Sequence, residues 1–362
     1  MSKAADLART ASASETALSN RNILYNGSMQ VAQRGADINS VANGGFCTDR
    51  FKISYANTDN LVLNLDQSTD TPAGFSSSLK LSVGTVESAL AADEYLQFGQ
   101  KIEAQNLQQL IYGTSSAKTL TLSFWVKSSA TGTYAVSIFQ SDATKYYSTT
   151  YTINSANTWE YKTVEISGNV SNVINNDNGE GLRVNWTLSA GTNYTSGSNG
   201  AWGAVTNWSV GHNVSWITTS GATFFITGVQ LEVGPVATPF EHRSYGQELA
   251  LCQRYFQKLG GSYGTYDGMF SGNVTGTDLL FVTTNSKVTM RSSPTFTLGG
   301  GVANHRYSQG GGDIQPSAIV ADQVKPNSLT LKVTHTGQVT SGNAARLFNN
   351  TTTGYYDFDA EL

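Results

Sequence analysis

The sequence predicts a mainly β protein: a jelly-roll-type antiparallel β-sandwich, one short amphipathic helix and a small C-terminal antiparallel β domain. Apolar and polar residues alternate over many short segments, as in strands with one buried face. Gly, Ser, Thr and Asn separate these segments and supply turns. Charged residues make up only 13% of the chain, whereas helical bundles carry many more.

The sandwich is expected over residues 22–239, because about eight alternating segments follow one another there. In "LTLSFWVK", Leu120, Leu122, Phe124 and Val126 share one face. The other apolar sets are Leu61, Leu63, Leu65; Leu79, Leu81, Val83; Tyr134, Val136, Ile138; and Leu182, Val184, Trp186, Leu188. Two antiparallel sheets that bury these sets against each other make one core.

A connecting helix is expected within residues 240–261, after Pro235 and Pro239 end the last strand. Ser244 and Gln247 have the spacing of a capping box. The predicted apolar stripe is Leu249, Cys252, Tyr255, Phe256, Leu259, of which Leu249, Cys252, Phe256 and Leu259 should be largely buried. A lone amphipathic helix must cover an apolar surface, which predicts that it plugs the junction with the next domain.

The two ends of the chain differ in character. Residues 262–362 contain four alternating segments and predict a small antiparallel sheet, with "LGGGVANHRYSQGGGD" as an exposed loop. Residues 1–21 are Ala-rich and polar, with too short an apolar stripe to hold a helix alone. They predict a loose N-terminal arm.

Composition and charge exclude several classes of protein. The hydrophobic fraction of 39% can fill a core, and 10% aromatic residues is too many for a disordered chain. The net charge is −4 with no basic run, so no nucleic acid is expected as a partner. There is no signal-peptide-like start and no apolar run of 18 residues, which predicts a chain made in the cytoplasm without membrane insertion.

Residues 190–221 form a long Gly-rich segment that carries several aromatic side chains. Long loops in compact domains usually serve a function. Tyr194, Trp202 and Trp208 lie there among Gly, Ser and Asn, and we take them as the candidate ligand-binding residues. Ligand contact and subunit contact both remain open for them. For Trp125, Trp159 and Trp186, in or beside strand patterns, we expect burial in the core.

No catalytic, metal-binding or cofactor-binding motif is recognised. His212, His242, His305 and His335 are scattered, and Cys47 and Cys252 lie far apart, which predicts buried, reduced thiols. Asp93–Glu94 and Asp357–Asp359 are acidic pairs of the sort that any β protein has by chance. We therefore expect no catalytic residue, no metal and no cofactor.

Several motifs resemble a bacteriophage virion family found in tail fibres and related appendages. These are "NILYNGSMQVAQRG", "CTDRF", "ATFFITGVQLEVGPVATPFEHRSYGQELALCQRYFQK" and "KVTMRSSPTFTL". The sandwich also resembles carbohydrate-binding modules, in which acidic residues of the opening and closing strands hold a structural calcium. Here Gln30, Thr227 and Gly228 stand at the matching positions, so the resemblance carries over the fold and not the metal site.

The resemblance implies a non-enzymatic phage virion protein, most simply a tail-fibre or adhesin component that binds a host surface glycan or receptor. It further implies a homo-oligomer, usually a trimer in fibres, that attaches to other virion proteins through the arm. One alternative is an assembly or decoration protein of the tail or capsid that contacts only virion subunits. A polysaccharide depolymerase is a third possibility and would need a groove with two carboxyl groups.

Overall fold

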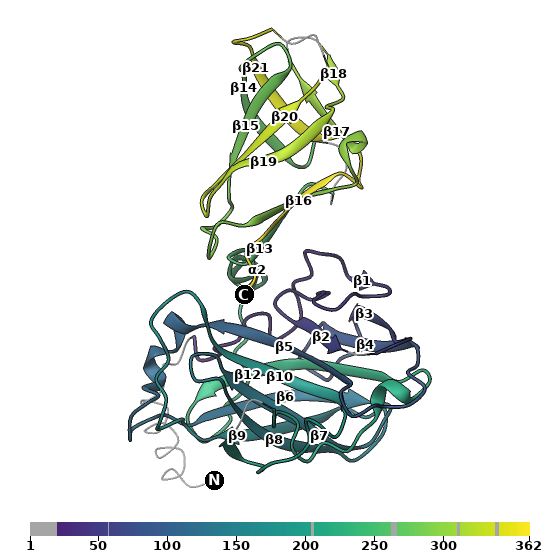
Figure 1. Ribbon diagram of the computed structural model, residues 1–362, viewed down its shortest axis with the longest axis vertical. Helices are drawn as coiled ribbons and strands as arrows, with labels where there is room; N and C mark the ends of the chain where they lie inside the picture. Colours follow the sequence, from purple (N-terminus) through teal and green to yellow (C-terminus); the bar gives the residue numbers. More distant parts are fainter. Residues whose placement is uncertain (1–19, 57, 204–205, 262–265, 310–311, 337–339) are drawn as a thin grey trace. The chain divides into compact units, whose positions relative to one another are not determined.

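The computed structural model describes residues 20–56, 58–203, 206–261, 266–309, 312–336 and 340–362. The chain divides into two compact units, one running to Glu248 together with Leu362 and the other from Leu249 to Glu361 (Figure 1). The division falls inside the segment 240–261 that the sequence predicts to be a connector. The proposed arm, apart from Asn20 and Arg21, lies outside the described residues.

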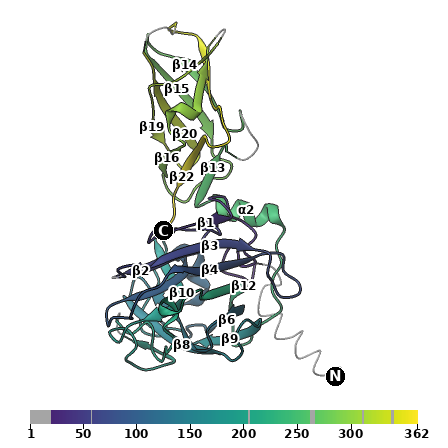
Figure 2. The ribbon, with the colours of Figure 1, turned by 90° about the vertical axis from the view of Figure 1, so that its right-hand side faces the viewer.

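The first unit is an antiparallel β-sandwich, which confirms the predicted fold class. Its first sheet has the order β1 (Asp37–Ile38), β3 (Val62–Ser68), β4 (Ser78–Thr85), β12 (Thr223–Val233), β6 (Leu120–Ser128), β9 (Glu160–Ile166). Its second sheet has the order β11 (Ala201–Gly203), β8 (Lys145–Ile153), β7 (Gly132–Gln140), β10 (Glu180–Ala190), β5 (Tyr95–Glu103), β2 (Lys52–Ala56). Two 3₁₀ turns, η1 (Ala104–Leu110) and η2 (Trp216–Thr218), complete the unit, and Figure 2 shows the two layers.

One core lies between these two sheets and contains the predicted alternating sets. Trp186 of the second sheet is fully buried and stacks on Phe98, with ring centroids 5.5 Å apart and planes 10° apart. Phe124 of the first sheet meets Trp186 edge-on at 5.7 Å. Cys47 is also buried in this core as a free thiol, as predicted.

The expected core position of Trp125 and Trp159 is wrong. Phe124 and Val126 point into the core, so Trp125 between them points to the outer face of the first sheet, where it packs on Tyr161 at 5.3 Å. Trp159 is half-buried, and its indole N–H donates to the Asp70 carboxylate at 3.1 Å. For Trp125, strand parity outweighs the general tendency of tryptophan to be buried, whereas Trp159 lies just before β9 begins at Glu160.

The opening segment lies against the closing strand β12, as the module-like motif implies. The Val229 amide donates to the Gly27 carbonyl at 2.9 Å, and a Cβ on Gly27 would lie only 2.1 Å from the Val229 carbonyl oxygen. The fully buried Asn26 side chain donates to the carbonyls of Val31 and Asp49 and accepts from the Val31 amide. The side-chain amide of Asn26 therefore fixes the conformation of the opening segment through these hydrogen bonds.

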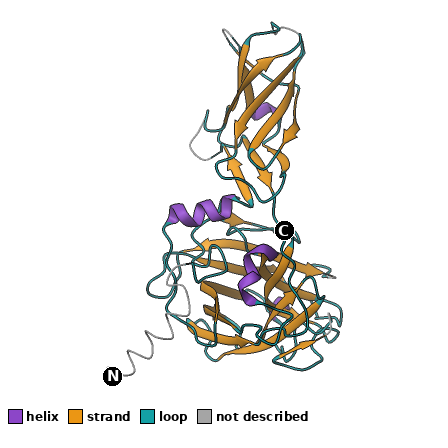
Figure 3. Ribbon diagram, turned by 90° about the vertical axis from the view of Figure 1, so that its left-hand side faces the viewer, coloured by secondary structure: helices purple, strands orange, loops and turns teal. Residues whose placement is uncertain are grey.

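The helix is shorter than the predicted stripe. α2 (Tyr245–Gln253) is one of the helices drawn in purple in Figure 3. It begins with the expected capping box, in which the Gln247 side chain accepts from the Ser244 amide at 3.1 Å. Phe256–Leu259 is not helical but forms strand β13, which pairs with β22 (Tyr355–Asp359). Cys252, Tyr255 and Phe256 are buried, whereas Leu249 and Leu259 are only half-buried. That the helix plugs a junction between the units stays a prediction.

The second unit contains two antiparallel sheets where the sequence predicted one. The smaller sheet has the order β13, β22, β16 (Thr295–Gly299). The larger has the order β18 (Asp313–Ile314), β17 (His305–Ser308), β21 (Ala344–Asn349), β14 (Met269–Val274), β15 (Leu279–Asn285), β20 (Ser328–Thr334), β19 (Ala318–Val324). The 3₁₀ turn η3 (Val302–Asn304) precedes β17.

The predicted exposed loop "LGGGVANHRYSQGGGD", residues 298–313, is wrong in part, because β16 ends in it, β17 lies within it and β18 begins at its last residue. His305 and Tyr307 are fully buried, and the Tyr307 ring lies 5.2 Å from that of His335. Because glycines flank this segment, the sequence pattern indicated a loop, whereas the structure has a strand of four residues there.

Candidate functional site

The outer face of the second sheet is the candidate site. Leu182, Val184 and Trp186 of β10 point into the core, so the alternate residues Arg183 and Asn185 point outward. From the alternation in the sequence, such residues are recognisable only as the polar side of each strand. Neighbouring strands add further polar side chains to the same surface, which we call the outer face.

A row of polar and small residues crosses the outer face from strand to strand, and we call it the polar row. It is fixed by the antiparallel register: Ser148 pairs with Ser137, Ser137 with Asn185, Asn185 with Gly99, and Gly99 with Lys52. Paired residues on one face of a sheet have their Cβ atoms about 5 Å apart. Five consecutive strands therefore contribute to one line.

Several side chains in and beside the polar row are buried without a hydrogen-bond partner among the described residues. The atoms concerned are Asn185 Nδ2, Ser137 Oγ, Thr187 Oγ1, Gln97 Oε1. Thr187 and Gln97 are themselves cross-strand partners. A buried polar atom left unpaired costs about 1–3 kcal/mol, so a cluster of such atoms is unusual unless another group satisfies them.

A pocket of about 380 Å³ opens at the β2 side of the polar row. Its lining residues are Asn43, Gly44, Lys52, Ile53, Ser54, Gly99, Lys101, Arg183, Asn185. Gly99 is part of the lining, and a Cβ there would lie 2.0 Å from the Val184 carbonyl oxygen. Backbone packing thus excludes a side chain at this point of the outer face.

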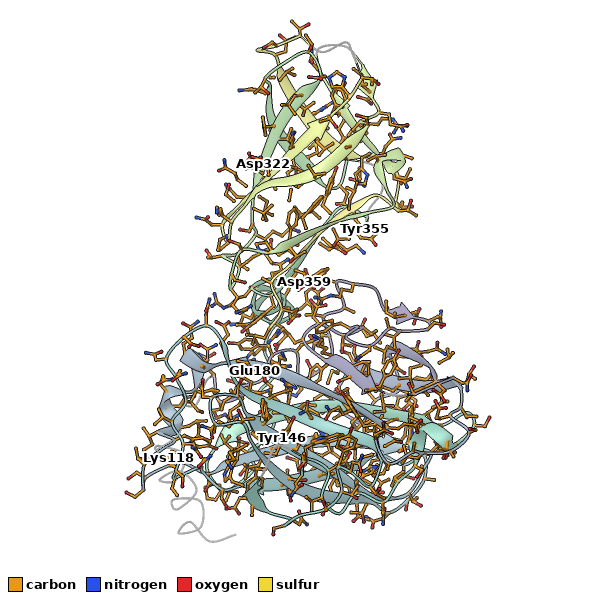
Figure 4. All side chains as sticks on the ribbon, viewed as in Figure 1. Lys118, Tyr146, Glu180, Asp322, Tyr355 and Asp359 are labelled. Atoms are coloured by element: carbon orange, nitrogen blue, oxygen red, sulfur yellow. The ribbon has the colours of Figure 1, made fainter. Side chains whose placement is uncertain are left out.

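Glu180 holds two of the lining cations in place. Its carboxylate accepts from Lys101 Nζ at 2.8 Å, and from Arg183 through Nε at 2.9 Å and Nη2 at 3.0 Å. The Arg183 guanidinium also lies over the Phe139 ring, 5.2 Å from its centroid. Figure 4 labels Glu180 in the first unit.

An aromatic cluster lies on the same outer face. Tyr194 and Trp208 come from the long loop, and their ring centroids are 4.7 Å apart. Tyr95 of β5 lies 5.2 Å from Trp208, and Tyr146 of β8 packs with them, as labelled in Figure 4. Burial raises the pKa of Tyr146, which keeps its hydroxyl protonated.

The structure brings together two of the three predicted ligand-binding residues. Tyr194 is half-buried and donates its hydroxyl to the Asp93 carbonyl at 3.1 Å, while Trp208 is only 6% exposed and supports the neighbouring rings. Trp202 lies apart, with its indole N–H donating to the Ser167 carbonyl at 2.8 Å and its ring against Tyr147 at 5.6 Å. Ligand contact by any of the three stays a prediction.

The other candidates from the sequence do not form a site of their own. Glu94 is buried, and its carboxylate accepts from the Ala91 amide at 2.7 Å, which is a turn-stabilising contact. Asp359 accepts from the Glu361 amide at 2.8 Å. Among the described residues, no three His, Cys, Asp or Glu side chains are grouped as a metal site requires. Within the same residues, no helix has the length and apolarity needed to cross a membrane.

His212 of the long loop, residues 190–221, is hydrogen-bonded to β7 of the second sheet. Its Nδ1 accepts from the Ala135 amide at 3.2 Å, so the ring proton is on Nε2, which lies 2.7 Å from the Val214 carbonyl oxygen. Burial lowers the pKa of His212 to about 4, although the hydrogen bond to Val214 favours the charged ring. A second proton could only go to Nδ1, where it would face the Ala135 N–H.

We expect the sandwich to lose stability as the pH falls from 7 to 4. The unfolded chain binds a proton at His212 near its ordinary pKa of 6.5, and the folded chain only near 4, so acid favours unfolding. This single group contributes about 3 kcal/mol to the loss. Urea denaturation at both pH values measures it, with His212→Gln as the non-titrating variant. An equal pH dependence in that variant would contradict the assignment.

The comparisons with known proteins are limited to shape. No protein-family model matches the chain, and neither does any curated protein. Among solved structures, the enzymatically active domain of bacteriophage CBA120 tailspike protein 4 is similar at 17% identity and a TM-score of 0.30. That match covers 54% of this chain and only 22% of the tailspike chain.

Carbohydrate-binding modules are also similar in shape. One of family 4 is 13% identical with a TM-score of 0.29, and covers 58% of this chain and 98% of the module. The TmCBM61 module, solved with β-1,4-galactotriose, is 10% identical with a TM-score of 0.27, and covers 54% of this chain and 99% of the module. Because each TM-score lies below 0.5, we infer function from this chain's own residues.

Proposed function

We propose that this protein is a non-catalytic tail-fibre or adhesin component of a phage particle, and that the outer face of its sandwich binds a host surface glycan. The observation that carries the binding proposal is the polar row, in which the buried Asn185 amide has no acceptor among the described residues and also lines a pocket. The quoted sequence motifs support the assignment to a phage appendage.

A saccharide suits the chemistry of this face. Its hydroxyls both donate and accept, so they match an amide donor at Asn185 and an acceptor oxygen at Gln97. The half-buried rings of Tyr95 and Tyr194 present apolar surface beside these groups, and sugar rings carry apolar C–H faces. Polar groups that fix orientation beside aromatic surface are typical of small-molecule sites.

We expect Asn185→Ala and Tyr194→Ala each to weaken saccharide binding about tenfold, the equivalent of one lost hydrogen bond or ring contact. The measurement is a screen of the full chain on a printed glycan array, followed by calorimetric titration with the strongest ligand. Asn64→Ala serves as the matched control, because Asn64 accepts from the Ser40 amide on the first sheet.

Three outcomes separate the alternatives within this proposal. Unchanged affinity in both site variants would place the ligand elsewhere. A loss confined to Trp202→Phe would move the ligand to the β11 edge, where Trp202 lies. The absence of binding to any glycan would contradict the function itself.

The alternative is an assembly or decoration protein that contacts only other virion subunits. Exposed apolar side chains on two neighbouring loops favour it: Ile111 is 41% exposed, Val170 57% and Val173 63%. Such patches are typical of protein interfaces. We further propose, from the motif resemblance, a homo-oligomer, most simply a trimer, attached through residues 1–21. Labelling the chain in intact particles separates a distal, receptor-facing position from a buried one.

A further inference from the structure

We propose that the pocket beside Lys101 receives an anionic substituent of the bound saccharide, a carboxylate or a phosphate carried on a sugar ring. This inference rests on the proposed function, because it names the class of ligand for the same outer face. It starts from the charge of the pocket lining.

Three cations from three adjacent strands line the pocket. Lys52 comes from β2, Lys101 from β5 and Arg183 from β10, and the lining contains no carboxylate. The chain as a whole is acidic, with 26 Asp and Glu against 22 Lys and Arg. The lining is therefore a local departure from the charge of the protein, and a site of one sign concentrates ligands of the opposite sign.

Lys101 and Arg183 share one carboxylate, that of Glu180, with which both form ion pairs. The Glu180 side chain is 11% exposed, whereas the side chain of Lys101 is 25% exposed and that of Arg183 is 27% exposed. Arg183 uses Nε and Nη2 for Glu180, which leaves Nη1 without an acceptor among the described residues. Glu180 thus orients two cations and does not neutralise both.

Another polar side chain of the lining, besides Asn43 and Ser54, is also a donor. Asn185 is 3% exposed, and its Nδ2 has no acceptor among the described residues. Ammonium and guanidinium groups donate and cannot accept. Donors from Lys101, Arg183 and Asn185 therefore match an acceptor-only group, which an ionised carboxylate or phosphate is and a hydroxyl is not.

The test uses pairs of oligosaccharides that differ only in a carboxylate, phosphate or sulfate, printed on one array and probed with the full chain. We expect the charged member of the best pair to bind about tenfold more tightly than its neutral partner, a difference of about 1.4 kcal/mol. We also expect added NaCl to weaken the charged member more than the neutral one. The pair that responds identifies the substituent.

Lys101→Gln should remove most of this preference, so that the charged and neutral partners bind the variant about equally. Lys80→Gln is the matched control: Lys80 also binds a carboxylate at 2.8 Å, that of Asp66, but on the first sheet. A thermal melt checks that each variant folds, and Lys52→Gln replaces Lys101→Gln if the latter does not.

The outcomes distinguish this inference from the proposed function. Equal binding of charged and neutral partners by the unmodified protein would overturn the anionic class and leave glycan binding standing. A preference that persists in Lys101→Gln and Lys52→Gln would also overturn it, because the charge would then be read elsewhere. If no saccharide binds, the proposed function fails and this inference with it.

Discussion

Trp186→Ala is expected to lower the free energy of unfolding of the sandwich by about 3–5 kcal/mol, as large aromatic truncations in cores do. Trp186 is fully buried, stacks on Phe98 and meets Phe124 of the opposite sheet edge-on at 5.7 Å. Its removal leaves a cavity between the two sheets that neither can collapse to fill. The measurement is urea denaturation followed by circular dichroism, with the transitions of the two units fitted separately.

Trp125→Ala is the matched control for that experiment. The same truncation removes a half-buried ring from the outer face of the first sheet, where water replaces it. We expect a loss well below that of Trp186→Ala, since the cavity contribution is missing. Equal losses would show that the sheet layers are not packed on Trp186.

Asn26→Ala is expected to destabilise the same unit by about 2–4 kcal/mol, because it removes the hydrogen bonds of a fully buried side chain to three backbone groups, at about 0.5–1.5 kcal/mol each. Those groups are the Val31 carbonyl at 2.8 Å, the Asp49 carbonyl at 3.0 Å and the Val31 amide at 2.9 Å. Asn26 also has a positive φ of 58°, which asparagine tolerates better than alanine. Denaturation as above measures the loss.

Asn64→Ala again provides the control, because the Asn64 side chain accepts from the Ser40 amide near the surface. Its loss should stay within about 1 kcal/mol, since water can replace that contact. Asn26→Asp tests the donor role separately: it keeps the acceptor for Val31 and removes both donated bonds. A variant Asn26→Ala as stable as the parent would refute the claim that this side chain organises the opening segment.

Much of the sandwich could be predicted from residue order alone, since alternation is a local signal. In a strand with one buried face, apolar residues recur at every second position, so the sequence indicates which side chains are buried. The structure confirms this for one such set, which is fully buried: Leu120, Leu122, Phe124 and Val126. The capping box of Ser244 and Gln247 is equally local. The alternation and the capping box each lie within a few residues of the chain, so both could be recognised from the sequence.

The helix end and the short strand β17 could not be predicted in the same way. Phe256 and Leu259 continue the helical spacing from Cys252, yet pairing with β22 about 100 residues later makes them a strand. The partner supplies the backbone hydrogen bonds that decide between the two structures, and no local pattern contains it.

The candidate site shows the same division. The sequence by itself determined that Arg183, Asn185 and Thr187 lie on the polar side of a strand, and that residues 190–221 are a long aromatic loop. Only the tertiary structure decided that Ser137, Asn185, Gly99 and Lys52 fall in one row, and that Trp202 lies apart from Trp208. Register between strands far apart in the chain is set by the packing of the whole core, so the residues that meet on its outer face are a property of the fold.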